Sequence, residues 1–533
     1  MLLNYVRSLY GKDELQRFAE FLVELESEAE SDPKAQELLK KYSILDDVEI
    51  PENITEIIRY GFVYDFCYAK EENVTEFPQL PDNVVELHDN KIKINYDLLT
   101  TYIIKRYCVV TFKKIIFIYR NGVFRENEGE IEKLIERILI HKGIADKKKI
   151  RDTVNEIIAR IQWRTFFTEF PFNKLSKDFI PLKNGVLWRK IYYLLPFSPA
   201  FGFTYRLPVK YDPNAKCPKI EKFINEIVDP KNVPILYEIP ATCLLQSPEY
   251  HVAYMLVGSG SNGKSTYLKL LERFLGKENV ANVSLQDLCS DKFKVAQLVG
   301  KLANIYADLP KKPIKYTGMF KVLTGGDRIT AERKYKDPFE FVNTARLIFA
   351  ANELPEVSDQ TIAFWRRWIV IEFPNTFPPN PDLINELTTE EELSGFLNKV
   401  LEALTRIEVK GITKTDVVEK IMEFWKKRSN SVYAFVVDCL ERDADYYETK
   451  DDVYNAYVEY CEENDFPPLS KNVFAQELQK HIQVRTERKK IGGSRVYVWK
   501  GVRLKCRPEE EESEEGSLSD YTEYVVDIDG YGS

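Results

Sequence analysis

The pattern of apolar and polar positions is clearest around residues 252–276. Apolar residues fill positions 252–257, and the glycine-rich stretch GSGSNGKST follows at residues 258–266. Beyond it, Leu268, Leu271 and Leu275 recur at the spacing of one helical face before Gly276. A short apolar run bounded by glycine is typical of a buried strand, and the three- and four-residue spacing is typical of an amphipathic helix. The pattern therefore predicts strand, loop and helix in that order.

Three more apolar runs follow downstream, at residues 302–307, 346–351 and 368–373. The first is followed by Asp308 and the second by Asn352. Ligands of open α/β sheets bind beyond the carboxyl ends of the strands, so both polar side chains are expected beside the glycine loop. We therefore predict an α/β protein whose core spans residues 216–380, starting with a helix that buries Ile220, Phe223, Ile224 and Ile227.

The regions before and after this core differ in their patterns. Residues 1–90 are polar with helical spacing and have no assigned role. Residues 91–215 mix strand-like runs, such as 109–119, with amphipathic helices around 131–141 and 150–161, and predict a helical or α+β domain. Residues 381–428 are interpreted as a helical linker or lid.

Residues 429–505 predict a winged helix. Helices are expected around 431–442, 451–463 and 471–481, the last with Ser470 as its N-cap, and a hairpin at 484–499 turns at the two glycines 492–493. The stretch is the most basic in the chain. Six of its cations are candidate phosphate contacts: Lys471, Arg485, Arg488, Lys489, Lys490 and Arg495. A winged helix that docks another protein is the alternative.

Composition narrows the setting of the protein. A chain of 533 residues with 44% hydrophobic residues can form several cores. The eight cysteines are scattered and there are only four histidines, so neither a zinc site nor a disulfide framework is expected and a reducing, cytoplasmic setting is favoured. No apolar run is long enough for a membrane span, and no secretory signal is expected.

Charge is distributed unevenly along the chain. The formal net charge is −9, and the tail from Arg507 onward has one basic residue against ten acidic ones. The remainder of the chain is therefore neutral, which leaves room for local basic patches. Residues 506–533 are expected to be disordered, and a solubilising role is favoured over recruitment of a partner.

The glycine-rich stretch fits the pattern G-x-x-x-x-G-K-S of a phosphate-binding loop. Glycines allow successive backbone N–H groups to surround an anion, and the helix N-terminus adds partial positive charge. Lys264 would reach the β- and γ-phosphates, and the Ser265 hydroxyl would bind Mg²⁺. The alternative is a flexible surface connection. The predicted nucleotide-binding residues are Gly258, Ser259, Gly260, Ser261, Asn262, Gly263, Lys264, Ser265 and Thr266.

Two further groups of cations are candidates for contacts with anions. Arg366 and Arg367 precede the last apolar run. They are interpreted either as an exposed, solvated edge or as an arginine finger, for which Arg367 is preferred and Arg366 is the second choice. Strand-like runs at 329–333 and 339–342 predict a hairpin whose tip carries Lys334, Tyr335 and Lys336. That tip is suited to a phosphate backbone and a stacked base, although an ordinary exposed turn is the alternative.

Five segments together resemble a known family: GSGSNGKST, IYADLP, FKVLTGGDRITAERKYK, RLIFAANELPEVSD and FWRRWIVIEF. They are similar, in family order, to the motifs of the superfamily 3 helicases of DNA viruses and plasmids, most closely the poxvirus-type and phage or plasmid primase-helicase group. The resemblance covers about residues 90–500. It implies a modified AAA+ core, a homo-hexameric ring, ATP and Mg²⁺ as cofactors, and unwinding of DNA during replication in the cytoplasm of a host cell.

The resemblance also implies roles for residues at matching positions. Lys264 and Ser265 hold phosphates and Mg²⁺, Asp308 is the acid on the metal side, Asn352 is the sensor and Arg367 is the finger. Lys334 and Lys336 fall in the DNA-contacting hairpin. Many members carry two adjacent acids in the second motif, whereas here Asp308 stands alone between Ala307 and Leu309. The group that activates the attacking water therefore stays open among Asp327, Glu332 and Glu353.

The sequence also leads to expectations about binding partners and about alternative activities. The expected partners are single-stranded and forked DNA, other copies of the chain, and a separate primase or other replication proteins. No primase activity is expected from the chain itself, because the alternating acids 443/445 and 527/529 lie in the winged-helix region and the tail. An ATP-binding origin initiator without independent unwinding, and a packaging or remodelling ATPase, are the two alternatives.

Overall fold

The computed structural model describes residues 52–67, 84–88, 91–310, 312–314, 316–332, 338–491 and 493–505, with a few isolated positions before residue 37. The chain divides into two compact units, Met1–Ile421 and Met422–Ser533, and we describe each by itself. Among the described helices, none combines the length and apolarity needed to cross a bilayer.

The first unit begins with helix α4 (Glu52–Cys67) and a hairpin of β1 (Val85–His88) and β2 (Lys91–Ile94). The predicted domain boundary at residue 90 is therefore wrong, because it falls between two paired strands. A four-stranded sheet in the order β5-β4-β3-β6 follows. Its strands are β3 (Val110–Phe112), β4 (Ile115–Arg120), β5 (Val123–Glu126) and β6 (Phe166–Phe167). Three helices bury isoleucines and leucines with this sheet: α5 (Tyr96–Tyr107), α6 (Glu128–His141) and α7 (Lys147–Arg164).

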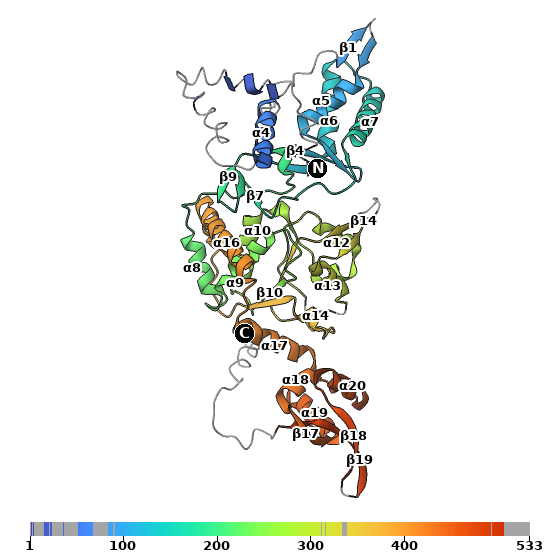
Figure 1. Ribbon diagram of the computed structural model, residues 1–533, viewed down its shortest axis with the longest axis vertical. Coiled ribbons are helices and arrows are strands. Elements are labelled where there is room, and N and C mark those ends of the chain that lie inside the picture. Colours follow the sequence, from blue (N-terminus) through green and yellow to red (C-terminus); the bar gives the residue numbers. More distant parts are fainter. Residues whose placement is uncertain are drawn as a thin grey trace, which may run out of the picture. The chain divides into compact units, whose positions relative to one another are not determined.

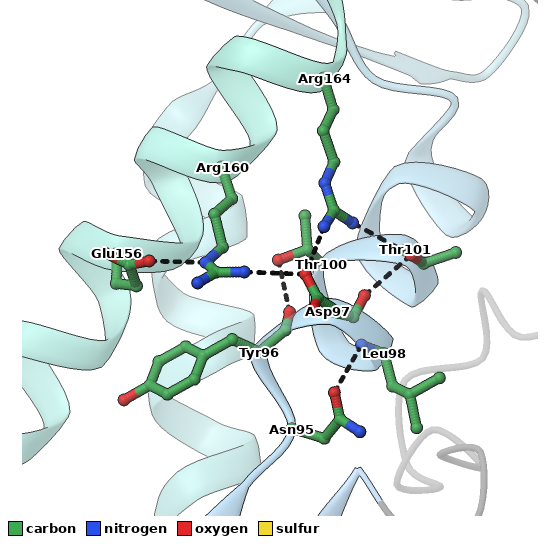
Figure 2. Close-up of polar contacts among 9 residues, drawn as sticks. All are labelled: Asn95, Tyr96, Asp97, Leu98, Thr100, Thr101, Glu156, Arg160 and Arg164. Carbon is green, nitrogen blue, oxygen red and sulfur yellow. Dashed lines mark hydrogen bonds and ion pairs between the residues drawn. The ribbon is translucent and has the colours of Figure 1, made fainter.

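A polar cluster joins the start of α5 to the last turns of α7, as Figure 2 shows. The Asp97 carboxylate accepts a hydrogen bond from Arg160 at 2.8 Å and another from Arg164. Arg160 also donates to Glu156 at 2.6 Å. The Asp97 side chain is 66% exposed, so water and salt screen these pairs and the apolar core contributes most of the stability.

A three-stranded sheet follows the module of the four-stranded sheet and its helices, and precedes the central five-stranded sheet in the sequence. It consists of β7 (Phe179–Leu182), β8 (Gly185–Trp188) and β9 (Tyr193–Leu195) and is followed by the short 3₁₀ helix η3 (Pro199–Phe201). Helices α8 (Pro218–Ile227) and α9 (Val233–Leu244) come next. All four apolar residues expected on the first helical face of the core are buried in α8, which confirms that prediction.

The central sheet has five parallel strands in the order β11-β12-β15-β10-β16. They are β10 (Ala253–Val257), β11 (Val280–Ala281), β12 (Ala303–Tyr306), β15 (Arg346–Ala351) and β16 (Trp368–Glu372). The four predicted strands are confirmed within one residue at each end. Every residue of β15 is buried, as expected for a parallel strand covered on both faces.

Shorter elements connect these strands. Helix α10 (Lys264–Leu275) follows β10, and the 3₁₀ helix η4 (Lys277–Asn279) precedes β11. Between β11 and β12 lie α11 (Leu285–Ser290), α12 (Lys292–Val295) and the 3₁₀ helix η5 (Ala296–Leu298). Between β12 and β15 lie α13 (Gly318–Gly325) and an antiparallel hairpin of β13 (Arg328–Ala331) and β14 (Phe339–Val342). The hairpin itself is confirmed.

The predicted linker packs on the core. Helix α14 (Ile362–Trp365) precedes β16, and α15 (Leu383–Leu387), α16 (Glu390–Lys410) and α17 (Asp416–Ser429) follow it. Helix α16 contacts α8 and α9 (Figure 1). Its buried Glu392 accepts the backbone N–H groups of Lys219 at 3.2 Å and Ile220 at 3.1 Å, and so caps the first turn of α8. Most of the region 381–428 therefore belongs to the first unit.

Beyond the end of α17, the described part of the second unit contains three helices and a three-stranded sheet. The helices are α18 (Ser431–Cys439), α19 (Lys450–Glu463) and α20 (Lys471–His481), and the strands are β17 (Leu440–Thr449), β18 (Arg485–Ile491) and β19 (Ser494–Leu504) in the order β17-β19-β18. The first expected helix ends at Cys439 rather than residue 442, because β17 begins at once and pairs with β19. The other two helices and the hairpin are confirmed. Ser470 occupies the N-cap position of α20, but its side chain does not make the capping hydrogen bond.

Candidate nucleotide-binding site

The glycine-rich loop joins strand β10 of the central sheet to α10, so strand, loop and helix occur in the predicted order. Its backbone has positive φ at Gly260 (129°), Ser261 (48°) and Gly263 (87°). A Cβ at Gly258 would lie 2.1 Å from Asn262 Nδ2 and 2.7 Å from the Phe373 carbonyl oxygen. A Cβ at Gly263 would lie 2.6 Å from Ile227 of α8. Close packing therefore requires glycine at both ends of the loop, and the positive φ is a second reason for it at Gly263.

Lys264 is held inside the loop. Its Nζ donates to the Gly258 carbonyl at 2.5 Å and to Asn262 Oδ1 at 2.8 Å, and the residue is only 6% exposed. Asn262 Nδ2 donates in turn to the Phe373 carbonyl at 3.2 Å, which ties the loop to the end of β16. Burial lowers the pKa of Lys264 to about 8, and the nearby Asp308 carboxylate opposes that shift. The ammonium group thus has partners that phosphate oxygens could replace.

The two polar side chains predicted beside the loop lie at the same sheet edge. Strand β15 lies between β10 and β12, with Val257 level with Ala351 and Tyr306 level with Phe349. The backbone continues this alignment, because the Leu309 N–H donates to the Ala350 carbonyl at 2.9 Å. Asp308 and Asn352 both follow these strand ends and are exposed. The structure therefore brings Asp308, Asn352 and the glycine loop together.

The two arginines before β16 differ in accessibility. Arg366 is exposed, whereas Arg367 is 8% exposed and donates through Nη1 to the carbonyl of Ala363. A Cβ at Gly325 would lie 3.5 Å from Arg367 Nη2. Burial lowers the pKa of Arg367, the charge of Arg366 lowers it further, and Asp327 opposes both. Arg366 is thus better placed than Arg367 to reach another molecule, which reverses the order of preference drawn from the sequence.

The candidate carboxylates occupy different surroundings. Asp327 interacts with Arg367, so it is engaged away from the glycine loop. Glu332 lines an open cavity of about 900 Å³ formed with β11, α12 and η5. Glu372 was missed by sequence reasoning: it ends β16 level with Val257, and burial raises its pKa. A carboxylate closing a buried strand beside the glycine loop is the signal that could have identified it.

The hairpin of β13 and β14 is present, but the expected contacts at its tip, Lys334, Tyr335 and Lys336, lie outside the described residues. At the described end of the hairpin, Lys113 Nζ lies 6.0 Å from the centre of the Phe339 ring. The β3–β4 turn of the preceding module therefore lies close to the end of this hairpin that adjoins its tip.

The expected cations of the second unit lie on two elements. Lys471 is the first residue of α20 and forms an ion pair with Asp451. The other five belong to the β18–β19 hairpin: Arg485, Arg488, Lys489, Lys490 and Arg495. Asp443 and Asp445 lie in β17, where the register with β19 shifts, and the Asp445 N–H donates to Asp443 Oδ1 at 3.1 Å.

Three family models match separate parts of the chain. "D5 N terminal like" matches residues 97–229, a family of unknown function (DUF5906) matches 256–367, and "Poxvirus D5 protein-like" matches 427–516. These segments cover the N-terminal module, the glycine loop with its sheet, and the second unit, respectively.

Similar curated proteins come from large DNA viruses. "Putative helicase L207/L206" of Acanthamoeba polyphaga mimivirus is 30% identical over 178 residues, which is 32% of this chain and 18% of that protein. "Putative helicase 184R" of Invertebrate iridescent virus 6 is 26% identical over 41% of this chain and 24% of that protein. "Putative helicase 022R" of Frog virus 3 is 26% identical over 40% of this chain and 24% of that protein. The chain therefore aligns with a quarter or less of each of these proteins.

Among solved structures, the apo A form of the NrS-1 C-terminal region is similar at 16% identity. The similarity covers 74% of this chain and 95% of that one, with a TM-score of 0.45.

Proposed function

Residues 97–229 and 427–516 belong to the poxvirus D5-like family, and from this premise we propose that the chain is an ATP-driven DNA helicase of viral replication. The helicase names of the similar viral proteins support the proposal. The observation that carries it is the meeting of Lys264, Asp308 and Asn352 at one sheet edge, beside a loop built to surround an anion.

The site fits ATP with Mg²⁺. The Ser265 hydroxyl and the Asp308 carboxylate are oxygen donors of the kind that Mg²⁺ prefers. Among the described residues no group of three or more His, Cys, Asp or Glu side chains could hold a metal, so phosphate oxygens and water would complete the coordination. When bound, Mg²⁺ would neutralise charge on the phosphates.

The residues of the loop can hold the triphosphate without large movement. Lys264 would exchange its bonds to Gly258 and Asn262 for bonds to phosphate oxygens, and the first turn of α10 would direct its N–H groups at the same anion. Asn352 would orient water or the γ-phosphate from the neighbouring strand. All three contributions are fixed by backbone elements before the nucleotide arrives, which is what electrostatic stabilisation of phosphoryl transfer requires.

A further part of the site would come from an adjoining copy in a hexameric ring, within an AAA+-type core. We assign the arginine finger to Arg366, because its side chain is exposed, and give Arg367 a positioning role at Asp327. A guanidinium placed across the interface would neutralise charge that develops on the transferred phosphoryl group. Single-stranded or forked DNA would be the substrate, with contacts from the β13–β14 hairpin and a winged helix in the second unit.

Mixing variant subunits tests this assignment. Arg366→Ala and Lys264→Ala should each lack ATPase activity, but a 1:1 mixture should recover roughly a quarter of it, because one random interface in four pairs an intact lysine with an intact arginine. Arg367→Ala is the matched comparison, and because Arg367 has a positioning role it should keep more ATPase activity than Arg366→Ala before any mixing. Absence of recovery with either arginine variant at every ratio would show that neither acts across an interface.

A further inference from the structure

The β18–β19 hairpin separates its cations onto two faces. The strands are antiparallel, with Arg488 opposite Tyr497 and Lys490 opposite Arg495. Side chains of directly paired residues lie on the same face, and successive residues alternate between faces. Arg488, Lys490, Arg495 and Tyr497 therefore share one face, which we call the Tyr497 face.

The opposite face carries Arg485, Lys489 and Lys500, and two of these cations have partners within the unit. Arg485 lies opposite Lys500 in the strand register, and the Lys500 ammonium lies 3.8 Å from the Glu487 carboxylate. Lys489 Nζ lies 3.5 Å from the centre of the Tyr447 ring. Glu487 is the one acidic residue in the sequence of the two strands, and on this face its charge offsets part of the positive charge.

On the Tyr497 face, cations alternate with aromatic rings. The Tyr497 side chain is 52% exposed, with the Arg488 guanidinium 4.7 Å and the Lys450 ammonium 5.9 Å from the centre of its ring. Lys450 also lies 3.9 Å from the centre of the Trp499 ring, which is buried in the core of the unit. The end of the Tyr497 face at Trp499 is therefore packed into the core of the unit, while the Tyr497 side chain is exposed to solvent.

The alternation of side chains along β19 is interrupted next to the core of the unit. Trp499 and Val502 both join the core although they are three residues apart, and Gly501 between them has φ of 98°. A positive φ at that point interrupts the strict alternation of β19. The β18–β19 hairpin extends past the helices of the unit (Figure 1).

We propose that the Tyr497 face binds the sugar–phosphate backbone of DNA, with a base or sugar stacked on Tyr497, and that the face of Arg485 and Lys489 does not. Cations in a row neutralise phosphates, and an exposed aromatic ring between them offers a stacking surface for any base. Arg488 holds the ring in place through its cation–π contact and keeps N–H groups for phosphate. The identity of the partner as DNA rests on the proposed function.

Two double variants of the full chain test the assignment of faces. Arg488→Ala with Arg495→Ala removes two positive charges from the Tyr497 face, and Arg485→Ala with Lys489→Ala removes two from the opposite face. Binding of a labelled single strand and of the matching duplex is followed by fluorescence anisotropy at several salt concentrations. The first pair should lower the slope of log affinity against log salt by about 1.4 for the single strand and about 1.8 for the duplex. The second pair should change it by less than about 0.5.

Tyr497 gives a test that does not change charge. Tyr497→Ala should weaken binding of the single strand by about 5- to 100-fold with an unchanged salt slope, because stacking is lost and every cation remains. Tyr497→Phe should restore most of the affinity. Far-UV circular dichroism and thermal unfolding of each variant show whether it is folded.

Equal loss of affinity in the two double variants, or loss in neither, would overturn the proposal, and so would a Tyr497→Phe protein as weak as Tyr497→Ala. A preference of the Tyr497 variants for duplex or single strand identifies which form stacks on the ring. The ATPase rate of the unaltered chain separates this result from the proposed function: DNA binding without ATP hydrolysis would refute the motor and leave the assignment of the DNA-binding face standing.

Discussion

Binding of ATP should be coupled to uptake of a proton by Lys264. The ammonium group is buried, its pKa is lowered to about 8, and its present partners are a carbonyl and an amide oxygen. A triphosphate would replace them with anionic oxygens, which favour the charged form and return the pKa toward its ordinary value. The free site should therefore hold less than one proton on this group at alkaline pH, and the bound site a full one.

The size of the effect follows from that pKa. At pH 8.5 a group with a pKa of 8 is about one-quarter protonated, so binding should take up about 0.75 proton; at pH 7.0 it is about nine-tenths protonated and the uptake should be about 0.1. The affinity for ATP should accordingly fall about fourfold between pH 7.0 and pH 8.5. The affinity falls as the pH rises because Lys264, whose pKa is lowered in the free protein, loses its charge there at a lower pH than in the complex with ATP.

Isothermal titration calorimetry in buffers of different ionisation enthalpy measures this uptake directly. Lys269→Met is the matched control, since Lys269 is exposed on the same helix and its loss should leave the uptake unchanged. Lys264→Arg keeps a fixed charge and should remove the difference between the two pH values wherever it still binds ATP. Equal uptake at pH 7.0 and pH 8.5 in the unaltered protein would refute the reasoning.

Three further results are expected. Gly258→Ala should weaken ATP binding at least about tenfold, because its Cβ meets Asn262 and a backbone carbonyl, whereas Gly318→Ala, which has open space around it, should not; equal affinities would contradict the packing argument. Burial alone would raise the pKa of Asp359, but hydrogen bonds from Lys321 and two threonines lower it, so this carboxylate should stabilise the fold above about pH 4 and lose that effect on acidification. Asp359→Asn should therefore cost about 1–3 kcal/mol in urea unfolding at pH 7, and this cost should decline only as the pH falls well below about 4. Asp97→Ala should shift the melting temperature by no more than about 3 °C, because its ion pairs are exposed; a larger shift in calorimetry would show that they hold α5 to α7.

The parts of the fold with strong local signals could be predicted from the sequence. The strand before the glycine loop, the helix after it and the helix with buried Ile220 and Ile224 each show the period of their own secondary structure. Strand β17 could not be predicted, because LERDADYYET shows no clear alternation and is held by pairing with the distant β19. Its pairing partners in β19 lie 49 to 64 residues away in the sequence.

The residues of the candidate site likewise divide into those that the sequence predicts and those that depend on packing. The spacing of the motif identifies the glycine loop and Lys264, and the ends of the apolar runs identify Asp308 and Asn352. The different exposure of Arg366 and Arg367 depends on packing against Gly325 and Asp327, which no spacing reveals. The two faces of the β18–β19 hairpin likewise require the register, because a shift of one residue would exchange them.

Strand separation of a forked DNA duplex is the most direct measurement of the central claim. The unaltered chain should separate the strands only with ATP and Mg²⁺, and its ATPase should increase on addition of single-stranded DNA. Lys264→Ala should abolish both activities while DNA binding persists. Unwinding that survives Lys264→Ala, or an unaltered protein that binds ATP and DNA but never separates the strands, would contradict the account.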